Sequence, residues 1–241
     1  MFYQNKKVAV VLMTWQRIPM LKETLNDLTN QTFQDFKLYI SNGNLELKDH
    51  VNQYVLASGK YLDVDVSHDG NDLRSFRRFY AARKAVEDGA DIVMFIDDDV
   101  ELPPKYLEKM LKQYEPKTYK SGFAWTIHEG GIDYYKHRTR RFQHGYKIHY
   151  CGTGVSIIDG SIFLDGGLFN APRGAMGIED LWLSYYAQHI LGWELAYAEM
   201  PKGTIIGGND RVALFKTYLE ADYTKADFLR ELVQAGWKIE E

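Results

Sequence analysis

Three consecutive carboxylates, Asp97, Asp98 and Asp99, come directly after an apolar run at residues 92–96. An uninterrupted run of branched and aromatic residues is typical of a strand buried on both faces. The carboxylates must then emerge at the carboxyl end of this strand, where open α/β sheets bind ligands. If the chain stays extended, Asp97 and Asp99 point to one side, with Cα atoms roughly 6.5–7 Å apart, and Asp98 points to the other. Carboxylates this close favour a cation between them, and such oxygen-rich sites suit Mg²⁺ or Mn²⁺.

The same acids could instead mark the start of a helix. Asp99 could cap a helix that begins near Pro103, and Glu101 would interact favourably with its dipole. A cap needs only one acid, however, and this stretch has three in succession. Ligand binding is therefore the favoured interpretation, and capping is the alternative.

A second acidic pair, Glu179 and Asp180, opens an apolar segment at residues 181–191 that has the length of a helix. Acids in the first turn of a helix interact favourably with its dipole and often serve only as caps. A positioned carboxylate can also act as a general base. The local sequence leaves both interpretations open.

The elements that would position these acids alternate between strands and helices, which indicates an α/β fold with a mostly parallel sheet covered on both faces. The basic block at residues 137–141 falls in a long predicted loop or hairpin at residues 128–149, and we expect it to be solvated rather than closed over phosphates. Strands are predicted at residues 8–13, 36–40, 61–66, 92–96, 122–127, 150–158 and 194–198, and helices at residues 19–30, 47–57, 73–87, 104–114, 181–191 and 226–235.

Composition narrows the class of protein. The chain has 241 residues, 45% of them apolar, and a net charge of −4. This charge argues against a general nucleic-acid or anionic-membrane surface. The single cysteine, Cys151, excludes an internal disulfide and a cysteine-based zinc cluster, and it fits a reducing compartment. The apolar run at residues 8–13 is too short for a membrane span or a signal-peptide core. We therefore expect a soluble, cytoplasmic protein with no membrane span and no nucleic-acid partner.

The order of these parts resembles the GT-A fold glycosyltransferases, in particular the family 2-like enzymes that use nucleotide-sugar donors. The resemblance extends over roughly residues 8–191. It implies a single GT-A-like domain, with a nucleotide-binding half at residues 1–100 and an acceptor-binding half with a C-terminal helix at residues 101–241. Four short motifs carry it: Thr14-Trp15-Gln16-Arg17, Phe95-Ile96-Asp97-Asp98-Asp99, Cys151-Gly152-Thr153-Gly154 and Gly177-Ile178-Glu179-Asp180-Leu181-Trp182.

The resemblance implies roles for the acids. Asp99 would bind the divalent cation, Mn²⁺ or Mg²⁺, and Asp97 would bind the cation or the donor's ribose, with Asp98 close to the nucleotide. A cation stabilises the negative charge of a departing nucleoside diphosphate. Asp180 would be the general base that deprotonates the acceptor hydroxyl for in-line attack at the anomeric carbon, which inverts its configuration. Glu179 would orient the acceptor or cap the helix.

Further residues would contact the substrates. The resemblance implies that Thr14, Trp15 and Arg17 cradle the nucleoside and that Asn42 contacts the base. The turn at residues 41–44 has no Asp where such enzymes commonly have one, so the base stays open, although uracil and hence a UDP-sugar is favoured. The arginines between residues 74 and 83 should mostly face solvent, while Arg74 and Arg78, near the start of their helix, could meet the diphosphate. The residues expected near the sugar or acceptor are Gly152, Thr153 and Trp182, with Trp182 in the core as the alternative.

Other functions remain as alternatives. The acidic motif could belong to a D-x-D phosphohydrolase, although that pattern wants Thr or Val where this chain has Glu101. The chain could also be a non-catalytic carbohydrate-binding protein on the same fold. No Gln-x-x-Arg-Trp motif follows the acidic pair, so transfer of one sugar to a saccharide or glycan acceptor is favoured over processive synthesis. A late motif at residues 209–211 could add a metal or phosphate contact.

Overall fold

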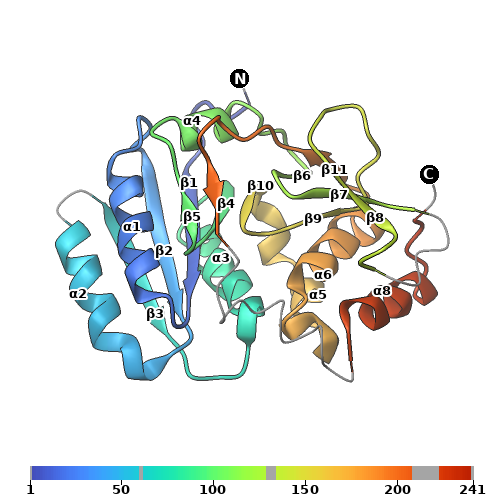
Figure 1. Ribbon diagram of the computed structural model, residues 1–241, viewed down its shortest axis with the longest axis horizontal. Coiled ribbons are helices and arrows are strands. Elements are labelled where there is room, and N and C mark those ends of the chain that lie inside the picture. Colours follow the sequence, from blue (N-terminus) through green and yellow to red (C-terminus); the bar gives the residue numbers. More distant parts are fainter. Residues whose placement is uncertain (1, 60–61, 129–133, 208–222, 240–241) are drawn as a thin grey trace.

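A seven-stranded sheet runs through the centre of the computed structural model, which describes residues 2–59, 62–128, 134–207 and 223–239 (Figure 1). Its strand order is β11–β6–β10–β4–β1–β2–β3. Strand β10 is antiparallel to both of its neighbours, and the other pairs are parallel. The strands are β1 (Val8–Thr14), β2 (Phe36–Asn42), β3 (Asp63–His68), β4 (Ile92–Asp97), β6 (Thr118–Ser121), β10 (Val155–Asp159) and β11 (Glu194–Tyr197).

Helices cover both faces of the sheet. They are α1 (Ile18–Thr29), α2 (Lys48–Ser58), α3 (Arg77–Glu87), α4 (Tyr106–Leu111), α5 (Gly166–Phe169), α6 (Glu179–Tyr185) and α8 (Lys225–Gln234). Short 3-10 turns lie at Leu45–Leu47, Arg74–Phe76, Gly160–Leu164 and Arg173–Met176, and a π-helical turn at Tyr186–Ile190 extends α6. Within the parts of the chain that the structure describes, no helix is both long enough and apolar enough to cross a membrane.

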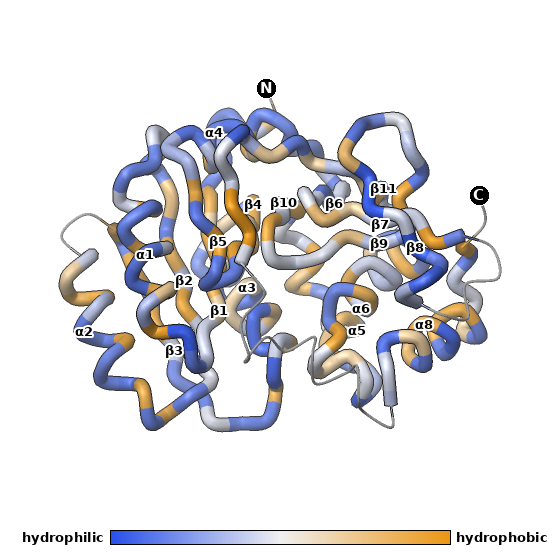
Figure 2. The backbone as a smooth tube through the Cα atoms, viewed as in Figure 1, coloured by the Kyte–Doolittle hydropathy of each residue, from blue (hydrophilic) through white to orange (hydrophobic). Residues whose placement is uncertain are grey.

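The central strands are buried on both faces, as the sequence predicts. Successive side chains of a strand point to opposite faces, so Leu12 of β1 packs with Leu21 of α1 while Val11 packs with Phe79 of α3. Figure 2 shows the central strands largely in the hydrophobic colour, and α8 in both colours, as expected for a helix with one buried face. These contacts belong to two apolar clusters, one on each face of the sheet. Parallel pairing of β1 with β4 between them places the carboxyl ends of the two strands side by side.

The acidic run does not stay extended. Strand β4 ends at Asp97, and Asp98 and Asp99 form a turn before β5 (Val100–Glu101). Strand β5 pairs with β12 (Ile205–Ile206), and the backbone N–H of Gly207 donates to the carbonyl of Asp99 at 2.8 Å. The prediction of alternating directions through Asp99 is therefore wrong, because pairing with a distant segment bends the chain.

A smaller three-stranded sheet lies beside the central one and contains β8 (Arg138–Arg141), β7 (Ala124–Ile127) and β9 (Tyr150–Cys151), in that order. Two predictions are corrected here. Residues 137–141 are not a solvated loop, because residues 138–141 pair with β7. Residues 150–158 are not one strand, because β9 and β10 belong to different sheets and the chain turns between them at residues 152–154.

Candidate active site

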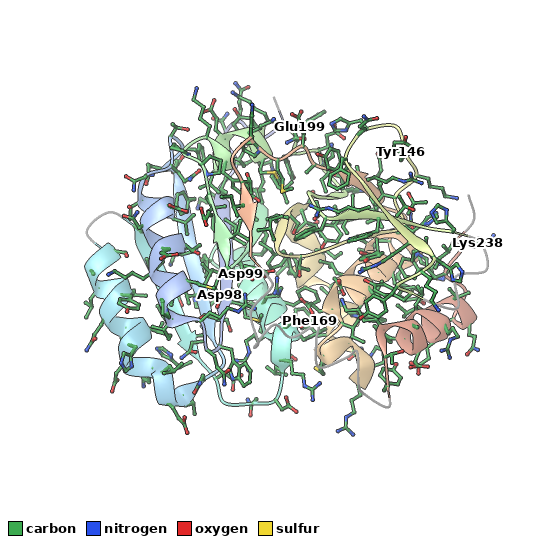
Figure 3. All side chains as sticks on the ribbon, viewed as in Figure 1. Asp98, Asp99, Tyr146, Phe169, Glu199 and Lys238 are labelled. Carbon is green, nitrogen blue, oxygen red and sulfur yellow. The ribbon has the colours of Figure 1, made fainter. Side chains whose placement is uncertain are left out.

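Arg17 joins two carboxylates of the acidic turn. It follows the end of β1, directly before α1, and its Nη1 lies 3.2 Å from Asp98 Oδ1 and also contacts Asp99 Oδ2. The hydroxyl of Thr14 donates to Asp98 Oδ2 at 2.8 Å. Burial raises the pKa of Asp98 to about 7, although Arg17 and Thr14 act in the opposite direction. Figure 3 shows Asp98 and Asp99 near the centre of the molecule.

Asp97 is held separately, by a buried arginine of α3. The Nη2 of Arg78 donates to Asp97 Oδ1 at 3.0 Å, while its Nε lies 3.2 Å from Oε1 of Glu179. Arg78 is only 4% exposed. The expectation that the other arginines of this stretch face solvent is wrong for Arg77, whose buried guanidinium donates to three backbone carbonyls of residues 69–74. One guanidinium thus links the acidic motif of β4 to the acidic pair of α6.

Glu179 is buried among polar partners. Its carboxylate accepts a hydrogen bond from Thr153 Oγ1 at 3.0 Å and another from the hydroxyl of Ser75. Burial raises the pKa of Glu179, while the positive charge of Arg78 opposes the shift. Glu179 therefore connects α6 to the turn at residues 152–154 and to α3.

Asp180 faces a lysine that the sequence analysis missed. Lys225 Nζ, at the first residue of α8, lies 3.1 Å from Asp180 Oδ2 and 3.3 Å from Oδ1. The backbone N–H of Leu181 donates to the same carboxylate at 2.9 Å. A capping box formed by Thr224 and Asp227 fixes where α8 begins and so where Lys225 projects. That box is legible in the sequence, but its proximity to Asp180 is not.

One cavity of about 350 Å³ brings the two acidic motifs together. Its lining includes nine of the predicted site residues, together with Lys225, Gly154 and a set of aromatic and basic residues from the smaller sheet. The predicted residues that line it are Arg17, Arg78, Asp97, Asp98, Asp99, Gly152, Thr153, Glu179 and Asp180.

The remaining predicted residues do not line this cavity. Thr14 is buried beneath Asp98, and Trp15 is half exposed. Arg74 lines a second cavity, of about 550 Å³. Asn42 is buried at the end of β2 rather than in a turn, and its amide bonds the backbone of residue 44 and His68 Nδ1. Its contact with a nucleotide base stays a prediction.

Trp182 belongs to the core. Its indole is 8% exposed, its Nε1 donates to the carbonyl of Leu168 at 2.8 Å, and it stacks on Tyr185. The prediction that it lines an acceptor pocket is not supported, since α6 turns this side chain away from the cavity. The late motif at residues 209–211 lies outside the described residues.

Asp97 and Asp99 offer the hard oxygen ligands that Mg²⁺ and Mn²⁺ prefer. Within residues 2–59, 62–128, 134–207 and 223–239, no three His, Cys, Asp or Glu side chains converge closely enough to form a complete metal site. A cation here would need further ligands from substrate phosphates and water, which is common for Mg²⁺. The side chains present therefore fit a cation that binds together with a phosphorylated substrate.

Comparison with known proteins decides the family. The sequence profile described as Glycosyl transferase family 2 matches residues 9–164, which is more than half of the chain. The chain belongs to this family. A similar protein is the uncharacterized glycosyltransferase YwdF of Bacillus subtilis (strain 168), which is 30% identical over 111 residues, or 45% of this chain. That match spans 38% of the relative's length.

Solved structures share the fold of this family 2 chain. Residues 1–349 of S. aureus TarS in complex with UDP give a TM-score of 0.59 at 14% identity, covering 95% of this chain and 70% of that one. The mannosyltransferase PcManGT from Pyrobaculum calidifontis, in complex with GDP-Man and Mn²⁺, gives 0.54 at 13% identity, covering 96% and 69%. The predicted α/β fold of the GT-A type is confirmed.

The turn between β9 and β10 leaves room for the carboxylate of Asp97. A Cβ at Gly154 would overlap this carboxylate and lie 2.6 Å from its Cγ. We expect Gly154→Ala to displace Asp97 from Arg78 and to lower the free energy of unfolding by about 1–3 kcal/mol. If a nucleotide binds beside Asp97, the variant should also bind UDP more weakly in the presence of Mn²⁺. Calorimetric titration and urea unfolding measure the two effects.

Gly166→Ala is the matched control, because no atom lies within 4 Å of a Cβ at Gly166. Its UDP affinity should equal that of the wild type. Unchanged UDP affinity in Gly154→Ala as well would show that the position of the Asp97 carboxylate does not matter for the nucleotide.

Proposed function

We propose that the chain is a metal-dependent glycosyltransferase that moves one sugar from a nucleotide-sugar donor, a UDP-sugar by preference, to a hydroxyl of a saccharide acceptor. The observation that carries the proposal is the meeting of Asp97, Asp98 and Asp99 with Asp180 at one cavity, in a chain of glycosyl transferase family 2. Relatives of the same fold were solved with UDP and with GDP-Man and Mn²⁺, and these names support a nucleotide-sugar donor.

The acids divide the work between leaving group and nucleophile. Asp180 accepts the proton of the acceptor hydroxyl, whose oxygen attacks the anomeric carbon as the bond to the diphosphate breaks. The bonding electrons leave with the nucleoside diphosphate, and a single displacement inverts the configuration. Arg78 and Glu179 hold the two acidic motifs in register, and Arg17 orients Asp98 and Asp99.

Asp97 and Asp99 would hold Mn²⁺ or Mg²⁺, which neutralises the developing charge of the diphosphate when bound. Thr14, Trp15 and Arg17, after β1, would bind the nucleoside. Residues 1–100 would form the nucleotide-binding half and residues 101–241 the acceptor-binding half of one domain. A cytoplasmic location stays a prediction.

A panel of nucleotide sugars with Mn²⁺ tests the proposal. We expect UDP-sugars to bind and to be hydrolysed slowly without acceptor, and we expect EDTA to reduce hydrolysis roughly tenfold or more until Mn²⁺ is restored. Chromatographic release of UDP is the readout. Binding without any turnover would favour a non-catalytic carbohydrate-binding protein, and phosphate release from simple phosphomonoesters would favour the D-x-D phosphohydrolase.

A further inference from the structure

The wall of the cavity beside Asp180 is formed by an arginine enclosed in aromatic rings. The guanidinium carbon of Arg138 lies 4.0 Å from the ring centre of Trp125 and 4.3 Å from that of Tyr134. Its Nη1 donates to the hydroxyls of Tyr134, at 2.7 Å, and Tyr150, at 2.5 Å. All four side chains line the cavity. Guanidinium stacking on aromatic faces fixes the side chain in one orientation.

Arg138 has donors that the described residues do not use. The described residues accept hydrogen bonds from its Nη1 alone and not from its Nε or Nη2. A guanidinium presents five N–H donors in a planar fork, which matches the two oxygens of a carboxylate or a phosphate. The fork therefore has capacity for an anionic ligand in the cavity.

No carboxylate of the described residues forms an ion pair with Arg138. Burial raises the pKa of Tyr134 and of Tyr150, so both phenols are neutral near pH 7. Asp180, in the same cavity, is paired with Lys225 at 3.1 Å. Among the described residues, this side of the cavity therefore carries one positive charge without a paired carboxylate, and a partly buried charge is stabilised by an opposite one.

The acidic side of the cavity has the opposite balance. Asp97, Asp98, Asp99 and Glu179 share the two guanidinium groups of Arg17 and Arg78. A cation is suited to that side, while an anion is suited to the side of Arg138. The aromatic rings add apolar faces, with Trp125 and Tyr150 stacked in parallel at 5.9 Å, and such faces suit the C–H face of a sugar ring.

We propose that Arg138 and the rings around it form a subsite for an acceptor saccharide that carries a negative charge, a carboxylate, sulfate or phosphate, next to the sugar that presents its hydroxyl to Asp180. This inference rests on the proposed function, since it names the class of acceptor for the same site. Arg138 is a residue that determines specificity, because it selects among acceptors and takes no part in the displacement.

A glycan array tests the inference with the donor side filled by saturating UDP and Mn²⁺. Each neutral saccharide on the array is paired with its uronic-acid, sulfated and phosphorylated counterparts. The wild type should bind at least one class of charged glycan ten times or more tighter than the neutral counterpart, and the class that binds identifies the anion. Arg138→Gln should lose this preference, while Arg138→Lys should keep part of it.

Arg141→Gln is the matched control on the same strand. The Nε of Arg141 donates to Thr126 Oγ1 at 2.8 Å, its guanidinium stacks on Tyr146, and it is not part of the cavity lining. Figure 3 shows Tyr146 at the outer rim, far from Asp98 and Asp99. The control should keep the wild-type preference. Equal loss in both variants would overturn the inference, because it would reveal a general electrostatic effect.

Other outcomes also decide the question. A wild type that hydrolyses a UDP-sugar yet prefers no charged glycan overturns the anionic subsite alone. A wild type that hydrolyses no nucleotide sugar overturns the proposed function. Weaker UDP binding in Arg138→Gln but not in Arg138→Lys would assign the arginine to the donor's phosphates and would likewise overturn the acceptor subsite. Circular dichroism checks that each variant is folded. If Arg138→Gln does not fold, the partial loss of preference expected for Arg138→Lys carries the test.

Discussion

Asp180→Asn is expected to abolish sugar transfer while leaving donor binding intact. A general base contributes roughly 10²–10⁴-fold to rate, and an amide cannot accept the acceptor's proton. The acids that would bind the donor are held by Arg17 and Arg78, whereas Asp180 is paired with Lys225. Transfer rates with saturating donor, together with UDP titrations, measure the split.

Lys225 supplies the control for this experiment. Asp180→Asn removes the carboxylate that pairs with Lys225 and so leaves a poorly exposed ammonium group unpaired. Asp180→Asn/Lys225→Met removes both charges. If the loss of transfer comes from the missing base, the double variant stays inactive. If transfer returns in the double variant, the stranded lysine caused the loss and the role of Asp180 as base is wrong.

Arg78→Met is expected to have the largest effect on stability. It would leave Glu179 buried without its ion-pair partner, and breaking a buried ion pair in this way costs about 3–5 kcal/mol. Burial already raises the pKa of Glu179, and loss of Arg78 would raise it further. Protonation would then relieve the cost at low pH, so the loss of unfolding free energy should be greater at pH 8 than at pH 5.5. Urea unfolding at the two pH values measures it.

Arg78→Met/Glu179→Gln is the matched comparison. The double variant leaves no buried charge unpaired at residue 179. The glutamine oxygen can accept a hydrogen bond from one of the hydroxyls of Ser75 and Thr153, and its NH2 group can donate to the oxygen of the other. It should regain most of the stability at pH 8 and should lose the pH dependence of the single variant. A single variant that is as stable as the wild type at pH 8 would show that this ion pair contributes little to the folded state.

The parts of the fold that could be predicted from sequence are those set by local patterns. The apolar run of β4 and the acids behind it identified the centre of the sheet, because burial on both faces requires continuous hydrophobicity. The directions of Asp98 and Asp99 could not be predicted, since the turn depends on the pairing of β5 with β12, about a hundred residues later. Local spacing describes the chain only while it stays extended.

Lys225 and Arg138 could not be assigned to the site from sequence because their contacts are tertiary. Lys225 meets Asp180 across 45 residues, and nothing in its own neighbourhood indicates a carboxylate partner. Arg138 was assigned to a solvated block because basic residues usually face water, and its burial depends on rings supplied by β7 and β9. The signal available was that Arg138 follows two aromatic residues, Tyr134 and Tyr135, at a distance of four and three positions.

The shared guanidinium of Arg78 makes the two halves of the cavity thermodynamically dependent on each other. A donor complex that drew Asp97 toward a cation would loosen its hold on Arg78, and the released charge would then act more strongly on Glu179. If donor binding changes the affinity for an acceptor that engages Glu179, then by linkage that acceptor must change the affinity for the donor by the same factor. In the proposed function, Arg78 of α3 would couple the affinities for the two substrates.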